Sequence, residues 1–109
     1  MEELVKIVIY TPVDHADDVR RVLGENRAGK IGNYDSCSFS ARGIGRFRPG
    51  EGSDPFSGER GKIESVEEER IETVCPRKIA GDVIEAVRNV HPYEEMAFDA
   101  YPLVNHEFM

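Results

Sequence analysis

The segment at residues 4–10 most constrains what this chain can fold into. Its sequence, Leu-Val-Lys-Ile-Val-Ile-Tyr, is apolar on both alternating faces except at Lys6, and it is rich in β-branched side chains. This pattern is typical of a central strand that is covered on both sides. Pro12 then ends the segment, because proline cannot donate to a strand ladder. The chain is therefore predicted to build its sheet around this segment.

Two amphipathic helices are predicted from apolar side chains at helical spacing. The first is expected over residues 15–27, with Asp14 as its N-cap and Gly29 closing it in a left-handed conformation. The second opens at Pro76, whose missing N–H does no harm at the start of a helix. It stops at His91, because the proline that follows pushes this residue out of the α region.

Three further strands complete the predicted fold. Residues 34–41 alternate so that Cys37 and Phe39 share a face, which we expect to be the inner one. A strand is expected at residues 63–74 and a short last strand at residues 98–104. The order strand-helix-strand-strand-helix-strand is that of an α+β ferredoxin-like plait with an antiparallel sheet. The predicted buried core consists of Ile7, Ile9, Val19, Leu23, Phe39, Ile71, Ile84 and Val87.

Composition limits the domain count and the partners. A chain of 109 residues is long enough for one core and too short for two, so residues 1–109 are expected to form a single domain. The net charge of -7 argues against nucleic-acid binding. No run approaches the roughly 20 apolar residues that span a bilayer, and the N-terminus is acidic, so we expect a cytoplasmic protein without membrane contact. Cys37 and Cys75 are expected to be reduced, buried thiols that pack as small hydrophobic side chains.

A glycine-rich basic loop is predicted at residues 43–61, as a long hairpin connection between the second and third strands. It holds six of the ten glycines, and five basic residues against three acidic ones lie between positions 42 and 62. Such a loop on an acidic body suits a small anion, held by guanidinium forks and backbone N–H groups. In the alternative interpretation, the arginines pair with the acidic stretch at residues 64–72. The candidate ligand-binding residues in the loop are Gly43, Gly45, Arg46 and Arg48.

A second candidate site is the sequence His-Pro-Tyr-Glu-Glu at residues 91–95. Imidazole and carboxylate groups suit zinc or another divalent cation. The candidate metal ligands are His91, Glu94, Glu95 and Cys37, with His15 or a neighbouring subunit as further donors. In the alternative interpretation, the proline ends the helix, Tyr93 packs at an interface and the carboxylates bond to backbone N–H groups. No spacing typical of a catalytic triad is visible, so enzyme activity is not expected.

Taken together, the motifs of this chain resemble those of the YqfO domain. That domain occurs as an insert in the dinuclear-metal, Nif-three-like protein family and also as a free-standing protein. The His-Pro-Tyr-Glu piece is also similar to the divalent-cation-tolerance protein CutA, which has a similar plait. The resemblance covers roughly residues 5–104 and is carried by Gly29-x-x-Gly32-Asn33-Tyr34, Cys37-x-Phe39, Gly43-x-Gly45-x-Phe47-x-Pro49, Pro55-x-x-Gly58, Glu69-Arg70-x-Glu72 and His91-Pro92-Tyr93-Glu94-Glu95.

The resemblance implies an oligomer, with a trimer favoured, because CutA and the PII signalling proteins are trimers of this fold. In the larger family, the metals are held by residues in segments that flank the insert. No such segment precedes Leu4 or follows the last strand here, so we expect the hydrolase-like chemistry suspected for that family not to carry over. Fold alone does not decide the function of the remaining module.

Three functional hypotheses stay open at this point. In the first, a non-enzymatic regulatory oligomer binds a small anionic metabolite in clefts between subunits. Arg46 and Arg48 would contact the anion, and Tyr93 would line the cleft. In the second, the protein binds a divalent metal ion as a CutA-like protein. In the third, it is a structural module that contacts a partner protein.

Overall fold

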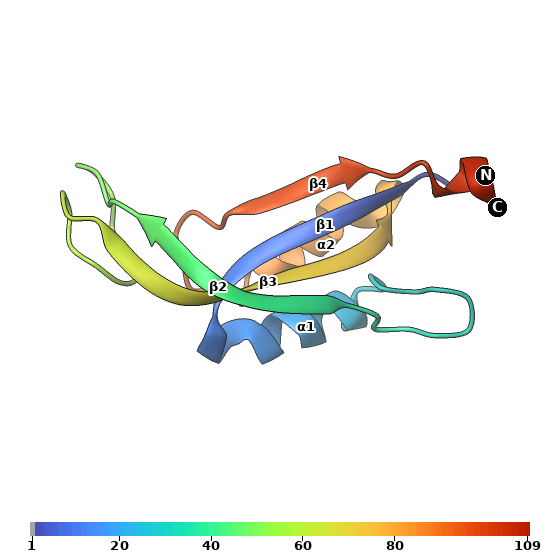
Figure 1. Ribbon diagram of the computed structural model, residues 1–109, viewed down its shortest axis with the longest axis horizontal. Helices are drawn as coiled ribbons and strands as arrows, with labels where there is room; N and C mark the ends of the chain where they lie inside the picture. Colours follow the sequence, from blue (N-terminus) through green and yellow to red (C-terminus); the bar gives the residue numbers. More distant parts are fainter. Residues whose placement is uncertain (1) are drawn as a thin grey trace.

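The sheet is built around β1 (Leu4–Pro12), as the sequence predicts, in a computed structural model that describes residues 2–109 (Figure 1). β3 (Glu64–Pro76) pairs with one edge of β1 and β4 (Phe98–Pro102) with the other, while β2 (Phe39–Phe47) pairs with β3. All pairs are antiparallel, and the strand order is β2-β3-β1-β4. The connecting elements are α1 (Ala16–Glu25), α2 (Arg77–Arg88) and two short 3-10 turns, η1 (Val13–His15) and η2 (Asn105–Phe108). The α+β plait predicted from the sequence is confirmed.

The hydrophobic core lies between the two helices and the face of the sheet that they cover. Alternate residues of the two central strands point into it, and Ile9 and Ile71 lie opposite each other in the β1–β3 register. Neither helix, nor any other within residues 2–109, is long and apolar enough to cross a membrane. The predicted core residues that the structure buries are Ile7, Ile9, Val19, Leu23, Ile71, Ile84 and Val87. Each contributes about 1.5–3 kcal/mol through burial, so this layer holds the fold together.

The second strand differs from its prediction. β2 runs from Phe39 to Phe47, whereas the sequence predicts a strand at residues 34–41 and a loop from residue 43 onward. Phe39 pairs with Glu72 and faces away from the helices, with 68% of its surface exposed, so its assignment to the core was wrong. Alternation has a period of two, and it does not say which face of a strand is covered. Cys37 lies before β2 and is only partly buried.

The caps of α1 also differ from their prediction. Asp14 lies in the turn η1, and the N-cap of α1 is His15, with no side-chain capping bond. The predicted cap at Asp14 was therefore wrong. At the other end, Asn26 is the C-cap, and its side-chain amide donates to a carbonyl one turn back at 2.8 Å. Gly29 does have a positive φ of 85°, but its N–H donates to Val74 of β3 and so anchors the loop to the sheet.

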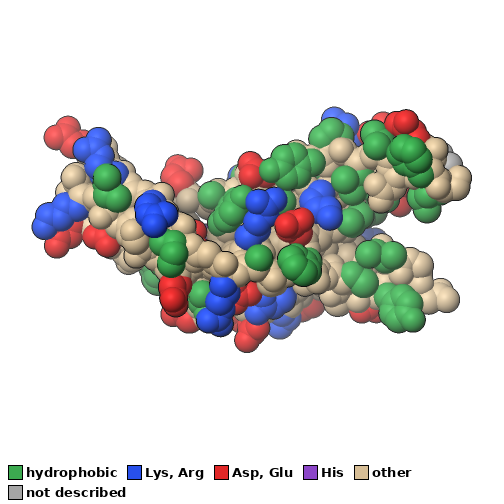
Figure 2. All heavy atoms as spheres, in the orientation of Figure 1, with side chains coloured by type: hydrophobic (Ala, Val, Ile, Leu, Met, Phe, Trp, Pro, Cys, Tyr) green, Lys and Arg blue, Asp and Glu red, His purple; other side chains and the backbone are tan. Residues whose placement is uncertain are grey.

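The second face of the sheet carries no helix (Figure 1). Phe39 and Tyr101 lie on it, with 68% and 46% of their surfaces exposed. Lys6 and Arg70 lie 3.8 and 3.2 Å from the carboxylate of Glu72. Figure 2 shows hydrophobic side chains interspersed with charged ones across this side of the molecule. We call this surface the open face.

Candidate functional site

A cavity of about 330 Å³ lies between the β2–β3 hairpin and the loop that joins α2 to β4. It brings together the two segments that the sequence analysis singles out, the glycine-rich loop and the His-Pro-Tyr-Glu-Glu sequence. Its lining residues include four aromatic residues, three glutamates and one arginine. The lining residues that matter below are Tyr10, Gly45, Arg46, Phe47, Phe56, Ser57, Glu68, Tyr93, Glu94 and Glu95.

Side-chain bonds to the backbone hold the hairpin loop over the cavity. The guanidinium Nε of Arg60 donates to the carbonyl of Ser53 at 2.7 Å, which folds the loop onto itself. The N–H of Asp54 donates to the carboxylate of Glu94 at 2.8 Å, which ties the hairpin loop to the loop after α2. Pro49 is buried at the base of the hairpin loop. The two walls of the cavity are therefore joined to each other.

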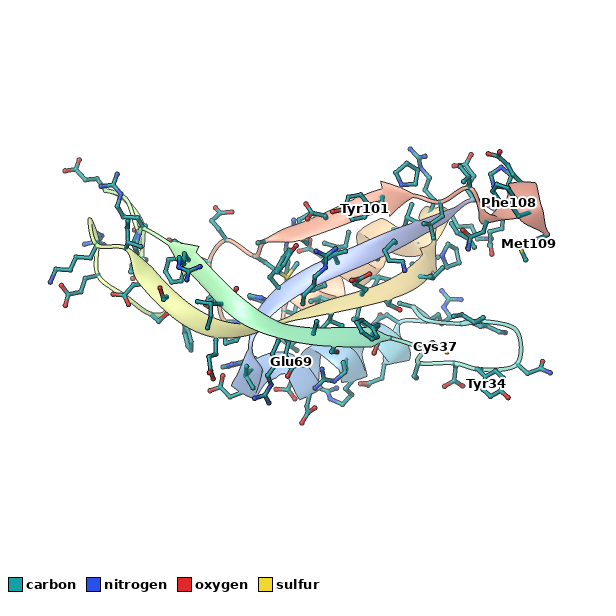
Figure 3. The ribbon with its side chains drawn as sticks, viewed as in Figure 1. Tyr34, Cys37, Glu69, Tyr101, Phe108 and Met109 are labelled. Carbon is teal, nitrogen blue, oxygen red and sulfur yellow. The ribbon has the colours of Figure 1, made fainter. Side chains whose placement is uncertain are left out.

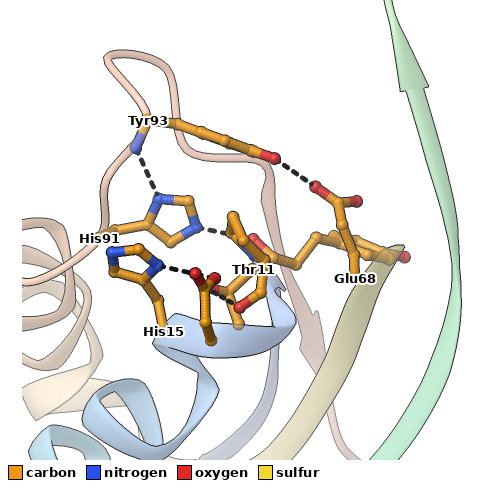
Figure 4. A network of polar contacts seen from close by, with 8 residues as sticks. Thr11, His15, Glu68, His91 and Tyr93 are labelled. Atoms are coloured by element: carbon orange, nitrogen blue, oxygen red, sulfur yellow. Dashed lines mark hydrogen bonds and ion pairs between the residues drawn. The ribbon is translucent and has the colours of Figure 1, made fainter. Parts of the chain in front are cut away.

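His91 fixes the loop after α2 to the sheet (Figure 4). Its Nε2 lies 2.7 Å from the carbonyl of Tyr10, and its Nδ1 lies 3.2 Å from the N–H of Tyr93. A carbonyl only accepts, so Nε2 carries the proton and Nδ1 accepts the bond from Tyr93. The ring is 7% exposed, and this burial lowers the pKa of His91 against the opposing effect of the bond to Tyr10. Both ring nitrogens are therefore used by the backbone.

Tyr93 and Glu68 form the polar centre of the cavity (Figure 4). The phenol of Tyr93 donates to Oε2 of Glu68 at 3.0 Å. Burial, followed by this bond to a carboxylate, raises the pKa of Tyr93, so the phenol stays protonated. Glu68 reaches this position across β2, where a Cβ on Gly45 would lie 1.9 Å from its Oε1. Glycine is therefore needed at position 45 for the carboxylate to lie where it does.

Two further aromatic rings contact Tyr93 of this pair. The ring centroid of Tyr93 lies 5.9 Å from that of Phe47 and 6.2 Å from that of Phe56. Phe56 also makes an edge contact with His15, at 5.6 Å, which anchors the hairpin loop to η1. Tilted and edge contacts of this kind contribute about 0.5–1.5 kcal/mol beyond the area that they bury. The aromatic wall therefore comes from β2, the hairpin loop and the loop after α2 together.

The structure brings together some of the predicted site residues and separates others. Of the predicted anion-binding set, the residues that line the cavity are Gly45, Arg46 and Tyr93. Gly43 and Arg48 are exposed and lie outside its lining. Among residues 2–109, neither Arg46 nor Arg48 forms an ion pair with the acidic residues of β3, so the alternative interpretation of a paired basic loop finds no support.

The proposed metal ligands do not form one site within a chain. Cys37 accepts a bond from Thr73 through its carbonyl, whereas the cavity is centred on Glu68. Thr73, which contacts Cys37, and Glu68, which lies in the cavity, are five positions apart on β3, or about 17 Å along a strand. Within residues 2–109, no three His, Cys, Asp or Glu side chains are grouped so as to hold a metal ion. The bonds of His91 to the backbone also leave it no free nitrogen. Within residues 2–109 of one chain these residues do not surround one metal position, and their role as metal ligands, with a donor from a neighbouring subunit, stays a prediction.

The sequence analysis missed Glu68, Phe47 and Phe56. Glu68 belongs to the acidic stretch that was considered only as a partner for arginines, and Phe47 and Phe56 were not assigned a role. The one available signal was register. The hairpin places Gly45 beside the first half of β3. Because Gly45 has no side chain, the carboxylate of Glu68 can lie against it. That register depends on where β2 lies, and the sequence pattern placed this strand at residues 34–41, too early in the chain.

Comparison with known proteins shows related sequences in longer chains. A protein from Halalkalibacterium halodurans, named a GTP cyclohydrolase 1 type 2 homolog, is 47% identical over 104 residues, which is 95% of this chain and 28% of that protein. The crystal structure of a Bacillus cereus protein related to NIF3 has 49% identity and a TM-score of 0.84, over 95% of this chain and 26% of that one. This chain thus spans about a quarter of the length of the relatives it matches. No protein-family profile matches it.

The fold alone is shared more widely. The PII-like protein CutA from a Nostoc species is 14% identical, with a TM-score of 0.69 over 94% of this chain and 84% of that one. Identity this low supports the common architecture and no common ligand. The resemblance noted in the sequence is confirmed by the longer relatives, and the similarity of fold to CutA is confirmed by this structure.

Proposed function

We propose that this chain, which by sequence and fold is a YqfO-type domain with a PII-like and CutA-like plait, is a non-enzymatic, regulatory module that binds a small ligand. The observation that carries the proposal is the cavity of about 330 Å³ between the β2–β3 hairpin and the loop after α2. Ligand sites are concave, mainly apolar, and about 300–1,000 Å³ in volume, with a few convergent polar groups. This cavity has those properties.

The polar groups of the cavity support a ligand site. The hydroxyl oxygen of Ser57 is buried in the cavity wall and has no hydrogen-bond partner within residues 2–109. Buried polar atoms without partners are rare in folded proteins, and an absent ligand is one explanation for them. The half-buried carboxylate of Glu68 receives a bond from one neutral phenol and from no cation. A ligand that formed hydrogen bonds with both groups would bind more tightly because the two groups are already in position.

A regulatory role suits the position of the hairpin loop. A ligand in the cavity would touch both the hairpin loop and the loop after α2, which are joined by the bond between Asp54 and Glu94. Binding would therefore stabilise one arrangement of the hairpin, and a partner protein that contacts the hairpin would detect that arrangement. The chain covers only a quarter of the relatives named as GTP cyclohydrolase homologs, so their activity enters no step of this proposal.

Self-association through the open face, with a trimer favoured, is the second part of the proposal. Phe39 and Tyr101 expose large apolar surfaces on a sheet face that no helix covers. β2 and β4 are sheet edges, which present unpaired backbone groups to a neighbouring chain. Native mass spectrometry of protein purified without chelator would measure the oligomer and any retained ligand mass. A monomer at micromolar concentration would contradict this part of the proposal.

The cavity itself can be tested with a matched pair of glycine variants and a neutral aromatic probe. Indole is expected to shift the amide resonances of residues 53–57 and 93–97 in the native protein. Gly45→Ala should weaken indole binding roughly tenfold, which corresponds to about 1.4 kcal/mol of binding free energy, because the new Cβ displaces the carboxylate of Glu68. Gly43→Ala is the control, since nothing lies within 4 Å of its Cβ position. Equal behaviour of the two variants, or no shift at these residues, would contradict the proposal.

The anion-binding role predicted for the basic loop is tested by a separate variant. Among residues 2–109, Arg46 is the basic residue that contributes to the lining of the cavity. A double substitution of Arg46 and Arg48 by Ala should weaken binding only of ligands that carry a negative charge. If it changed the affinity for no tested nucleotide or carboxylate, the anionic form of the proposal would be removed and the cavity would remain.

A further inference from the structure

From the lining of the cavity, we infer that it binds a methylated ammonium group, as carried by choline and related small organic cations. The inference rests on the proposed function, because it names the ligand class of the same cavity. Two features carry it. One is a group of aromatic rings that no protein cation covers, and the other is a half-buried carboxylate that supplies a negative charge beside them.

The aromatic group consists of Phe47, Phe56 and Tyr93, which all line the cavity. The ring of Tyr93 contacts the other two, with centroids 5.9 and 6.2 Å apart and interplanar angles of 57° and 53°. Rings tilted in this way turn their faces in different directions, so a rounded group can touch more than one of them. The face of an aromatic ring is the negative part of its quadrupole and attracts a cation within about 6 Å of the centroid.

These three rings are not covered by a cation of the protein itself. Within residues 2–109, the one ring of the cavity lining that has a guanidinium over it is that of Tyr10, at 5.8 Å from Arg70. Arg70 also lies 3.2 Å from the carboxylate of Glu72, which balances its charge. Tyr10 is therefore left out of the proposed site, and the other three rings are available to a cation from solution.

The second feature is the carboxylate of Glu68. Its Oε2 accepts the bond from the phenol of Tyr93, and its Oε1 lies against the backbone of Gly45. No Lys, Arg or His within residues 2–109 lies within ion-pair distance of it. The side chain is half-buried, so water screens its charge less than it screens a surface charge. Glu68 therefore attracts a cation through its charge, while both of its oxygens already have neighbours.

The phenol of Tyr93 responds to this negative charge. Burial raises the pKa of Tyr93, and the bond to Glu68 and then the charges of Glu68 and Asp14 raise it further. A negative potential that opposes ionisation of a phenol also favours a cation at the same place. The centre of the cavity is therefore more favourable to a positive group than to a negative one.

The two features together select one kind of cation. A primary ammonium group has three N–H donors, and each of them needs an acceptor when it leaves water. A fully methylated nitrogen has no donor and spreads its charge over a rounded, apolar surface. Ring faces and one nearby charge are what such a group requires, and the contact with a ring contributes about 0.5–2 kcal/mol. An anionic group of the same ligand, as the basic loop predicts, would lie toward the exposed side chain of Arg46.

The experiment is a titration of the native protein with choline and with its uncharged isostere, followed by amide NMR. The isostere is the alcohol in which a tert-butyl group replaces the trimethylammonium group. Both molecules keep the same hydroxyl group, so a bond to Ser57 would be equal in the two. We expect choline to shift the amides of residues 53–57 and 93–97. Choline should bind at least roughly tenfold more tightly than the alcohol, because the ring faces and the charge of Glu68 attract only the cation.

A variant pair assigns the charge effect to Glu68. Glu68→Gln keeps the size of the side chain and an oxygen that accepts the bond from Tyr93, but it removes the charge. It should weaken choline binding at least roughly fivefold and leave binding of the alcohol unchanged. Glu67→Gln, at the exposed neighbouring position, removes the same charge and should leave both affinities unchanged. Amide spectra of both variants show whether they are folded.

A second variant pair tests the rings. Phe56→Leu keeps an apolar side chain but removes one ring face, so it should weaken choline binding at least roughly threefold and affect the alcohol less. Phe39→Leu, on the open face, is the control and should change neither affinity. The comparison of choline with the alcohol in the native protein needs no variant at all.

The outcomes separate this inference from the proposed function. Equal binding of choline and the alcohol, or a Glu68→Gln variant that binds choline as tightly as the native protein does, would overturn the ligand class. Indole shifts at the cavity without any shift from choline would also overturn the ligand class, while the cavity would remain a binding site. No cavity shift from indole, choline or the alcohol would remove both.

Discussion

The two faces of the sheet differ in what covers them. On the helix side, Ile9 and Ile71 lie opposite each other and are completely buried. Figure 3 labels Tyr101 of β4, which lies on the open face. Tyr101 remains 46% exposed and Phe39 of β2, on the same face, 68%. The same antiparallel sheet therefore packs against a buried core on one face and exposes large apolar side chains on the other. The main hydrophobic core of the chain lies on the helix side, and Val8 is a buried apolar residue on the open face.

Two adjacent glutamates on β3 show the difference at the scale of one residue. Glu69 points to the helix side, where Arg20 of α1 bonds to it at 2.6 Å and also to Ser40 of β2. Glu68 points to the other side, where a neutral phenol is its only donor within residues 2–109. Glu69 forms an ion pair with Arg20, and the bonds of Arg20 connect α1 to β3 and β2. Glu68 is unmatched, which is why we assign binding to Glu68 and architecture to Glu69.

The largest expected contrast between buried and open regions is in thiol reactivity. Cys75 is buried on the helix side, and burial raises its pKa to about 11, so few molecules carry the reactive thiolate at pH 8. Cys37 is partly exposed. With a chromogenic disulfide reagent at pH 8, Cys37 should react at least roughly a hundredfold faster than Cys75. Comparable rates, with Cys37→Ser used to isolate Cys75, would mean that the core opens readily.

Truncation of one apolar side chain on each face gives the next contrast. Ile71→Ala should lower the free energy of unfolding by about 2–5 kcal/mol, because it leaves a cavity in a packed core. Phe39→Ala should change it by less than about 0.5 kcal/mol in the isolated chain, since its ring is mostly exposed. Urea unfolding of both variants provides the measurement. A large loss in Phe39→Ala only at high protein concentration would support self-association through the open face.

Removing the charge of each glutamate tests the assignment of their roles. Glu69→Gln should lower the free energy of unfolding by about 1–2 kcal/mol, a value reduced because the side chain of Arg20 is 30% exposed. Glu68→Gln should cost less than about 0.5 kcal/mol, because the amide oxygen still accepts the bond from Tyr93. Thermal unfolding of the pair would measure this. A greater loss in Glu68→Gln than in Glu69→Gln would show that Glu68 is the structural residue of the two.

The smallest effect concerns pH and His91. Burial lowers the pKa of His91 in the folded chain below its ordinary value of 6.5, so the unfolded chain binds the proton more readily. Its contribution to stability is therefore full above about pH 6.5 and declines as the pH falls below that value. The unfolding temperature should drop between pH 7.5 and pH 5.5 in the native protein and drop less in His91→Gln. His106→Gln, at an exposed position, should behave like the native protein.

The sequence predicted most of the covered side of this molecule. The order of elements could be predicted from the apolar run of β1 and from the helical spacing of Val19, Leu23, Ile84 and Val87. Burial against one core gives each helix or strand its own characteristic spacing of apolar residues. Phe39 was misplaced because an edge strand is free to face either way. Its apolar character suited a core that it does not reach.

The candidate site was harder to predict because its parts lie far apart in the sequence. Tyr93 and Arg46 were chosen from local motifs, and both line the cavity. Glu68 could not be chosen locally, since five glutamates between positions 64 and 72 look alike. The β2–β3 register pairs Glu68 with Gly43 and Val66 with Gly45, and the side chain of Glu68 reaches diagonally over Gly45, which distinguishes it from its neighbours. The predicted anion site considered only the basic loop, whereas the cavity lining also includes Glu68 of β3.

The two ends of the described chain lie side by side at one end of the long axis (Figure 1). The carbonyl of Leu4 accepts a bond from the N–H of Leu103 at 3.0 Å, which holds the first and last strands together there. The hairpin and its cavity lie at the opposite end of a body 48 Å long. Such a unit can be placed within a surface loop of a larger protein without forcing the two sides of that loop apart. The hairpin end would then project away from the host, an arrangement that suits a unit whose relatives are more than three times its length.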